Sequence, residues 1–296
     1  MDQGLRADLV APDGPLAGAE LAAVHPVSGG CIHQAWRLDL NDGRRLFAKS
    51  GPSQANALFE VEAEALQALH DVADPDWLVV PKPLARTVLA NGAVLLLPWL
   101  DFAGRDQSSL GRGLALLHQA SMRTSEGAYG WHRDGYIGAG LQVGGWRENW
   151  GAAFVELRLR PQLKSLKQTA LGSAELDPLL QAIAASLDGH GCSPALVHGD
   201  LWSGNAGCLM DGRGSLYDPA CWWADCEVDL AMTRLFGGFS QSFYKAYQDV
   251  LPYKEGSEDR IDIYNLYHLL NHANLFGGSY IQQSIGCLKQ LTKDLL

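Results

Sequence analysis

Apolar and polar residues alternate in the first third of the chain, and this pattern predicts a small antiparallel sheet. Residues 36–40 alternate, residues 41–43 (Asn-Asp-Gly) are turn formers, and residues 46–49 resume the pattern. A second pair of short apolar segments, 87–89 and 94–97, flanks an Asn-Gly turn. Both patterns are typical of β-hairpins.

One helix is expected between the hairpins, from about Ser53 to His70, because its apolar residues recur at helical spacing. Glu62 falls on the apolar stripe of this helix, whereas Glu60 and Glu64 fall on the opposite side. Burying a carboxylate without a partner is costly. Lys49, at the end of the preceding strand, is the candidate partner; the alternative is that Glu62 lies at the edge of the stripe in water.

Beyond Pro98 the apolar positions recur mainly at helical spacing. We expect helices near residues 108–122, 146–168 and 174–187, four more from residue 228 to the end, a Gly- and aromatic-rich loop at 127–145, a short strand at 195–197 and a hairpin at 208–217. This order predicts an α+β fold of two lobes. Residues 1–97 would form an N-lobe with a small antiparallel β-sheet and one helix, and residues 98–296 a larger, mainly helical C-lobe.

The composition and charge of the chain limit which kinds of binding partner we expect. A hydrophobic content of 47% is enough for an extensive core, while the net charge of −10 and the pI near 5.3 argue against nucleic acid. The first residues carry acids and do not resemble a signal peptide. The longest uncharged apolar run, residues 87–100, is shorter than the roughly 20 residues that span a bilayer. We therefore expect a soluble, cytoplasmic protein that binds no membrane.

Six cysteines show no C-x-x-C spacing and no nearby histidines arranged as zinc ligands. Reduced thiols that pack as small hydrophobic side chains are expected.

The strongest chemical signal is the segment H-G-D-L-W-S-G-N at residues 198–205, followed by Asp218 thirteen residues after Asn205. Phosphoryl transfer needs carboxylates and an amide that position the nucleophile and metal ions. Asp200 would then aim the acceptor hydroxyl and receive its proton late, without needing a raised pKa. Asn205 and Asp218 would hold the metal, and His198 would support the loop. The structural alternative is a polar turn that caps backbone amides.

Weaker signals gain meaning from their order. Gly29 and Gly30 form a turn that would let backbone amides approach ATP phosphates, and Lys49 ends a strand as in the lysine strand of kinases. Trp202 lies between the candidate base and the metal-binding Asn. Its indole would border the apolar face of a sugar, or else pack in the core.

Taken together, these motifs resemble the fructosamine kinase (ketosamine-3-kinase) family within the aminoglycoside phosphotransferase-like kinases. The resemblance is carried by residues 198–205, especially Trp202, and by segments 217–220, 235–239 and 270–277. It implies a bilobal protein-kinase-like fold and ATP-dependent phosphorylation of the 3-hydroxyl of ketosamines. These would be fructosamine, ribulosamine or erythrulosamine adducts of small amines or of protein lysines, and decomposition of the product would free the amine (deglycation).

The resemblance also implies roles for individual residues, matched by position. Asp200 would be the base, and Asn205 and Asp218 would hold Mg²⁺. Lys49 and Glu62 would anchor the phosphates of ATP beneath Gly29 and Gly30, and the adenine-facing hinge would consist of Leu97, Pro98, Trp99 and Leu100. Trp202 and His272 would border the sugar. Cys31 matches a cysteine in the glycine turn, from which we hypothesise redox inhibition. Leu141 and Gly144 depart from the family pattern of Pro and Asn, which predicts a more mobile lid and leaves the preferred sugar open.

Two other functions stay open at this point. One is a different small-molecule kinase of the same fold, acting on an aminoglycoside, a choline-like compound or another hydroxyl substrate. The other is a nucleotide-binding regulator without turnover. The chain could be a monomer or a homodimer.

Overall fold

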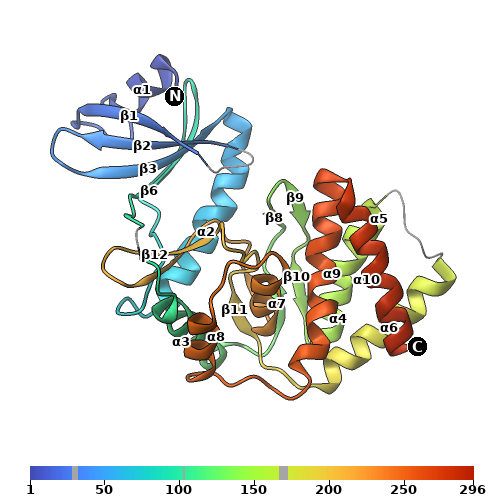
Figure 1. The fold of residues 1–296 in the computed structure, drawn as a ribbon. Coiled ribbons are helices and arrows are strands. Elements are labelled where there is room, and N and C mark those ends of the chain that lie inside the picture. Colours follow the sequence, from blue (N-terminus) through green and yellow to red (C-terminus); the bar gives the residue numbers. More distant parts are fainter. Residues whose placement is uncertain (29–32, 103, 167–172) are drawn as a thin grey trace.

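The computed structural model describes residues 1–28, 33–102, 104–166 and 173–296. A small part that contains a β-sheet adjoins a larger, mostly helical part (Figure 1). Gly29, Gly30 and Cys31 lie outside the described residues, so their phosphate-binding and redox roles remain predictions. None of the helices in the described ranges is both long and apolar enough to cross a bilayer.

A five-stranded antiparallel sheet in the order β1-β2-β3-β6-β5 forms the N-terminal part. Its strands are β1 (Leu21–Val27), β2 (Gln34–Leu40), β3 (Arg45–Gly51), β5 (Ala85–Leu89) and β6 (Gly92–Pro98), and α1 (Gln3–Val10), a 3₁₀ turn (Ser53–Ala55) and α2 (Asn56–Val72) accompany them. The two predicted hairpins and the helix are confirmed. The sequence patterns did not predict α1 and β1.

Both faces of β6 are buried, which fixes the sheet between two helices. Val94 and Leu96 belong to a core with Leu9 of α1, whereas Ala93, Leu95 and Leu97 belong to a core with Phe59 of α2. Successive side chains of a strand point to opposite faces, so an apolar run of this kind serves two cores. Because β3 pairs with β6, Lys49 stands opposite Leu95 in the middle of the sheet.

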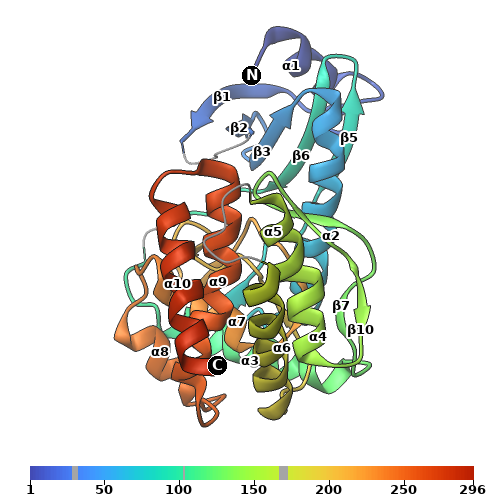
Figure 2. The same cartoon turned by 90° about the vertical axis from the view of Figure 1, so that its right-hand side faces the viewer.

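The helical part comprises α3 (Ser108–Thr124), α4 (Trp150–Phe154), a π-helical turn (Val155–Leu159), α5 (Arg160–Ser165), α6 (Ser173–Gly189), α7 (Glu227–Leu235), α8 (Gln241–Gln248), α9 (Ser257–Phe276) and α10 (Ser279–Leu295). The helices α4, α5, α6, α9 and α10 lie together on one side, as the two perpendicular views show (Figures 1 and 2). Trp150, Phe154 and Tyr264 are fully or almost fully buried among them. The four helices expected after residue 228 are confirmed.

Short strands run through this part: β4 (Leu78–Val79), β7 (Tyr129–Trp131), β8 (Gly135–Ile137), β9 (Gly140–Gln142), β10 (Gly145–Arg147), β11 (Ala195–Val197), β12 (Ala206–Cys208), β13 (Gly214–Leu216) and β14 (Trp222–Ala224). Residues 127–145, expected as a loop, therefore contain strands, and this prediction was wrong. The cause is close backbone pairing: a Cβ on Gly130 would lie 1.9 Å from the carbonyl oxygen of Gly145. The helix expected from Trp146 begins at Trp150, since residues 145–147 pair with β7.

One strand crosses the predicted border between the lobes. β4 precedes residue 98, yet it pairs in parallel with β13 of the helical part, with Leu78 opposite Gly214. Tertiary pairing, which local patterns do not encode, places this short strand. A division at residue 97 remains a prediction.

Two helical glycines provide a matched test of packing. A Cβ on Gly111 of α3 would lie 2.1 Å from the carbonyl oxygen of Phe243 in α8, whereas a Cβ on Gly286 of α10 would meet nothing within 4 Å. We expect Gly111→Ala to lower the unfolding free energy by about 2 kcal/mol, because the two helix backbones must separate. Gly286→Ala should raise it by up to about 1 kcal/mol, because Ala is the better helix former. Urea unfolding measures both; equal effects would contradict the close contact.

Candidate active site

One buried ammonium group joins three distant elements of the chain. Lys49 of β3 places Nζ 2.8 Å from Oε1 of Glu62 in α2 and 2.5 Å from Oδ1 of Asp218, which follows β13. The side chains of Lys49 and Glu62 are only 12% and 14% exposed. The ion pair expected from the sequence is therefore present, and the alternative that Glu62 lies in water is wrong.

The charges in this cluster hold one another in place. Burial alone would lower the pKa of Lys49, but the carboxylates of Glu62 and Asp218 outweigh burial and raise it. Burial and the neighbouring Asp218 raise the pKa of Glu62, and the Lys49 ammonium opposes them. One positive and two negative groups leave the cluster with a surplus negative charge, which favours a bound cation.

Asp218 has a backbone conformation that few side chains adopt. Its φ of +56° makes it the non-glycine residue with positive φ among those the structure describes. Asp tolerates the left-handed region better than bulkier residues do, and such a conformation persists where its surroundings enforce it. Here Lys49 holds the side chain, and Nδ2 of Asn205 lies 3.4 Å from the Asp218 carbonyl oxygen.

Asp200 and Asn205 face each other across the loop that follows β11. Nδ2 of Asn205 donates to the Asp200 carbonyl at 2.9 Å and to Oδ2 of the same residue at 3.1 Å. Because the same amide nitrogen also approaches the carbonyl of Asp218, the structure brings together Asp200, Asn205 and Asp218.

The Asp200 carboxyl titrates far above the ordinary range of an aspartate. Its pKa is raised to about 7, mainly by burial. The hydrogen bond from Asn205 opposes this rise, and the carboxylates of Asp218 and Asp229 contribute to it. The role predicted from the sequence did not require a raised pKa; the burial of this carboxyl in the folded chain, which the sequence does not reveal, produces it.

The buried carboxylate of Asp229 stabilises the start of the loop that follows β11. Asp229 of α7 is fully buried and accepts from the backbone N–H groups of His198 at 2.7 Å and Gly199 at 2.8 Å. Nε2 of His118 lies 3.2 Å from the same carboxylate. The contacts of Asp229 with a loop thirty residues away could not be read from local spacing.

His198 is oriented to support the loop. Its Nε2 lies 2.9 Å from the carbonyl oxygen of Tyr217, and Asp200 donates its backbone N–H to Nδ1 at 3.3 Å. These partners assign the neutral tautomer with the proton on Nε2. Burial lowers the pKa of His198, which favours the same neutral form.

Trp202 lies in the loop and is exposed, whereas His272 belongs to α9 and is half-buried. Trp202 is 37% exposed, so the alternative that it packs in the core is wrong. The ring of His272 contacts Phe236 at 5.0 Å between centroids, and a Cβ on Gly238 would lie 2.5 Å from Ser203. The turn after α7 therefore links the surroundings of His272 to the Trp202 loop.

The predicted hinge comprises the last two residues of β6 and the two residues that follow it. Leu97 is buried in the core, while Pro98, Trp99 and Leu100 are partly exposed. Trp99 donates its backbone N–H to the carbonyl of Arg45 at 3.2 Å and its indole N–H to Asp101 at 2.9 Å. These contacts tie the hinge to the edge of β3.

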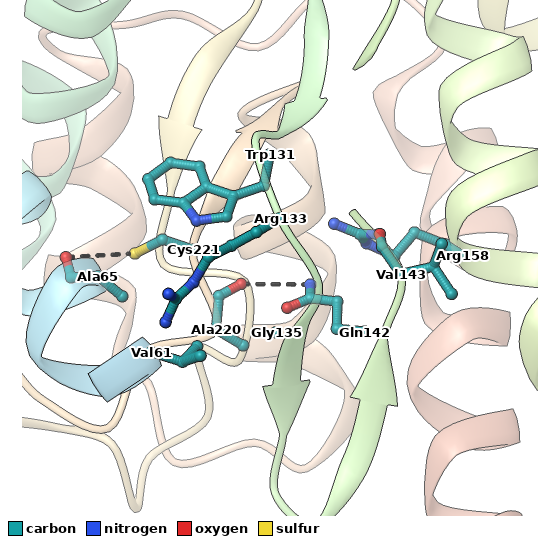
Figure 3. A pocket seen from close by; sticks show the side chains of 10 residues that line it. All are labelled: Val61, Ala65, Trp131, Arg133, Gly135, Gln142, Val143, Arg158, Ala220 and Cys221. Atoms are coloured by element: carbon teal, nitrogen blue, oxygen red, sulfur yellow. Dashed lines mark hydrogen bonds between the residues drawn. The ribbon is translucent and has the colours of Figure 1, made fainter. Parts of the chain in front are cut away.

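A small pocket lies behind the residues that follow Asp218 (Figure 3). Gln142 of β9 points toward the Ala220 carbonyl (Figure 3), and its side-chain oxygen, turned to face the nearby guanidinium, accepts from Nε and Nη2 of Arg158 at 3.2 Å each. Arg158 is buried and stacks on Trp222, with 3.7 Å between the guanidinium carbon and the ring centroid. The β8–β9 hairpin thus packs against the backbone that follows Asp218. The sequence did not predict this contact.

Gly144 was expected to make a lid mobile, but the structure gives a packing reason for glycine at this position. A Cβ there would lie 2.2 Å from the backbone of Arg133, and the Gly144 N–H donates to Asp134 at 2.8 Å. Glycine is required by close approach, so a mobile lid does not follow from it.

The donor set fits a hard divalent cation. Carboxylate and amide oxygens are the ligands that Mg²⁺ prefers, and the side chains of Asp218 and Asn205 carry one group of each kind. The surplus negative charge around Lys49 favours the same kind of ion.

Comparisons with known proteins agree with one another. A family model described as fructosamine kinase matches residues 13–294. A probable ketoamine kinase from Synechocystis is 40% identical over 267 residues, covering 89% of this chain and 88% of that protein. A chloroplastic protein-ribulosamine 3-kinase from Arabidopsis thaliana is 36% identical over 282 residues, covering 93% and 84%.

Solved structures extend the likeness to the fold. A crystal structure from Haemophilus somnus, provisionally named a fructosamine-3-kinase, superposes with a TM-score of 0.84 and 26% identity, covering 98% of both chains. An aminoglycoside phosphotransferase in complex with AMP-PNP and hygromycin B reaches a TM-score of 0.68 at 12% identity over 98% of both chains, which shows the fold alone. The predicted protein-kinase-like fold is confirmed.

The raised pKa of Asp200 links stability to pH. A carboxyl with a higher pKa in the folded than in the unfolded chain binds its proton more tightly when folded, so the unfolding free energy falls as pH rises from about 4 towards 7. Asp200→Asn removes this loss. Without ligands, we expect the variant to exceed the wild type in stability at pH 8, with a smaller difference at pH 5.

Urea unfolding at both pH values measures this difference. The control is Asp211→Asn, because a hydrogen bond from Arg213 lowers the pKa of that exposed carboxyl and its removal should bring no gain at pH 8. An equal gain for both variants, or none for Asp200→Asn, would contradict the buried, proton-binding carboxyl.

Proposed function

The chain belongs to the fructosamine kinase family, and from this premise we propose that it is an ATP-dependent ketosamine-3-kinase acting in deglycation. The observation that carries the proposal is the meeting of Asp200, Asn205 and Asp218 around one amide nitrogen. Its acceptors would be ketosamines on small molecules or on protein lysines.

Asp200 acts as the base in the proposed reaction. It accepts the proton of the sugar 3-hydroxyl while the hydroxyl oxygen bonds to the terminal phosphorus of ATP and the bond to ADP breaks. Its place beside Asn205 suits this task, because a base must lie within hydrogen-bond reach of the proton that it accepts.

The other residues position the reactants. Lys49, oriented by Glu62, offers its ammonium to the phosphates of ATP, and residues 97–100 face the adenine. Asn205 and Asp218 hold Mg²⁺, which when bound offsets phosphate charge during transfer. Trp202 and His272 border the sugar. The Gly29-Gly30 turn, redox control at Cys31, the cytoplasmic location and a monomer or homodimer remain predictions.

A panel of acceptors tests the reaction class. We expect the purified protein, with ATP and Mg²⁺, to transfer phosphate to at least one of fructosyl-, ribulosyl- and erythrulosyl-lysine. Mass spectrometry would detect the added phosphate and subsequent release of the amine. Transfer only to aminoglycosides or choline-like alcohols would support a different kinase of this fold, and nucleotide binding without any transfer would support a regulator.

Variants of the two carboxylates test their separate roles. Asp200→Ala should lower kcat by at least about 100-fold while nucleotide still binds, since positioning and proton acceptance are lost together. Asp218→Asn should raise the Mg²⁺ concentration needed for half-maximal rate as well as lower kcat. Steady-state kinetics across a Mg²⁺ series, with calorimetric nucleotide binding, measure both effects. Turnover of Asp200→Ala above about one tenth of wild type would contradict its role.

A further inference from the structure

A second cluster of metal-ligating side chains lies at the opposite end of the strand that leads to the catalytic loop. β11 pairs antiparallel with β14, and Ala195 stands opposite Ala224. Residues shortly before β11 and directly after β14 therefore meet at one edge. There His190 and Cys192, from the loop after α6, lie beside Asp225.

The three side chains converge closely. One ligand atom from each lies within 4.8 Å of the others. Nε2 of His190 is 2.6 Å from Oδ2 of Asp225, and these side chains are only 6% and 2% exposed. The set offers an imidazole nitrogen, a sulfur and a carboxylate oxygen, which no step of the proposed kinase reaction uses.

Neighbouring groups hold these side chains in place. Tyr264 donates its hydroxyl to Oδ2 of Asp225 at 2.6 Å, and the backbone N–H of Glu227 donates to Oδ1 at 3.2 Å. The hydroxyl of Tyr129 donates to the Cys192 carbonyl at 2.7 Å and lies 3.4 Å from its sulfur. Outer partners of this kind orient the ligands of metal sites.

The cluster also contains unused polar capacity. Nδ1 of His190 is buried and has no hydrogen-bond partner within the described ranges. A buried polar atom without a partner is costly, and each such atom needs an explanation. The spacing His-x-Cys at residues 190–192, overlooked in the sequence analysis, is the local signal of this cluster.

We propose that His190, Cys192 and Asp225 bind one divalent transition-metal ion of the zinc class at a structural site separate from the magnesium site. Zinc accepts mixed nitrogen, sulfur and oxygen ligands, whereas Mg²⁺ prefers oxygen. The ion bridges the loop before β11 and the start of α7, which carries the Asp229 brace of the catalytic loop.

Binding requires small movements and releases one proton. Ligand atoms around a tetrahedral zinc ion are separated by about 3.4 Å. Donors up to 4.8 Å apart must therefore approach by roughly 1 Å, while Nε2 of His190 and Oδ2 of Asp225, now 2.6 Å apart, must separate by a similar amount. Cys192 binds as the thiolate and gives its proton to solvent, while His190 binds through one neutral ring nitrogen and keeps its proton on the other.

Cobalt provides a readout specific to the sulfur ligand. We would titrate reduced, chelator-treated protein with Co²⁺ in saturating Mg²⁺ and without nucleotide or acceptor. One equivalent of Co²⁺ should produce a thiolate-to-cobalt charge-transfer band that Zn²⁺ abolishes. Cys192→Ser should remove the band, and His190→Gln should weaken Co²⁺ binding at least about tenfold.

Two control variants separate this site from other thiols and from the catalytic centre. Cys287→Ser alters another half-buried thiol and should keep the band. Asp218→Asn should also keep it, because the catalytic ligands contain no sulfur. Circular dichroism checks that each variant is folded; if Cys192→Ser is not, the affinity of His190→Gln decides.

The proposal is overturned if wild-type protein gives no charge-transfer band, or if the band persists in folded Cys192→Ser. It is also overturned if His190→Gln binds Co²⁺ as tightly as the wild type. Because the titration needs neither ATP nor acceptor, failure of phosphate transfer would leave this result unaffected.

Discussion

The arrangement of the active site depends on one ammonium group shared by two carboxylates. Lys49 belongs to the sheet, Glu62 to α2 and Asp218 to the segment after β13, so a single side chain joins elements 13 and 169 residues away from it in sequence. Buried ion pairs contribute little net stability, because removing charges from water offsets their attraction. We hypothesise that the cluster instead fixes the sheet relative to the catalytic loop, where its surplus negative charge attracts a cation.

The loop at residues 198–205 contains a carboxyl that is costly to bury, and neighbouring side chains stabilise the backbone of this loop. Burying the Asp200 carboxyl raises its pKa to about 7, which opposes folding when the group is ionised. Asp229 stabilises the start of this loop by accepting hydrogen bonds from two backbone N–H groups. Gln142 lies beside the backbone of Ala220, which follows Asp218. Structural support of this kind allows functional residues to occupy unfavourable surroundings.

The pairing of β11 with β14 connects the active site to the second cluster. One end of β11 leads directly into His198 and the catalytic loop, while His190 and Cys192 precede the other end. A constraint at the second cluster would therefore act on β11, which precedes Asp200, and on β14, which follows Asp218. This arrangement gives the proposed structural metal a route to the active site through backbone pairing.

The sequence by itself determined the elements and chemistry that depend on local spacing. Alternation predicted the hairpins, helical periodicity placed Glu62 on an apolar stripe with Lys49 as its candidate partner, and the segment from His198 to Asn205 with Asp218 indicated phosphoryl transfer. Only the tertiary structure decided how deeply Asp200 is buried, that Asp229 braces its loop, and that residues 127–145 form strands. These features depend on contacts between residues far apart in the chain, and neither periodicity nor local spacing encodes such contacts.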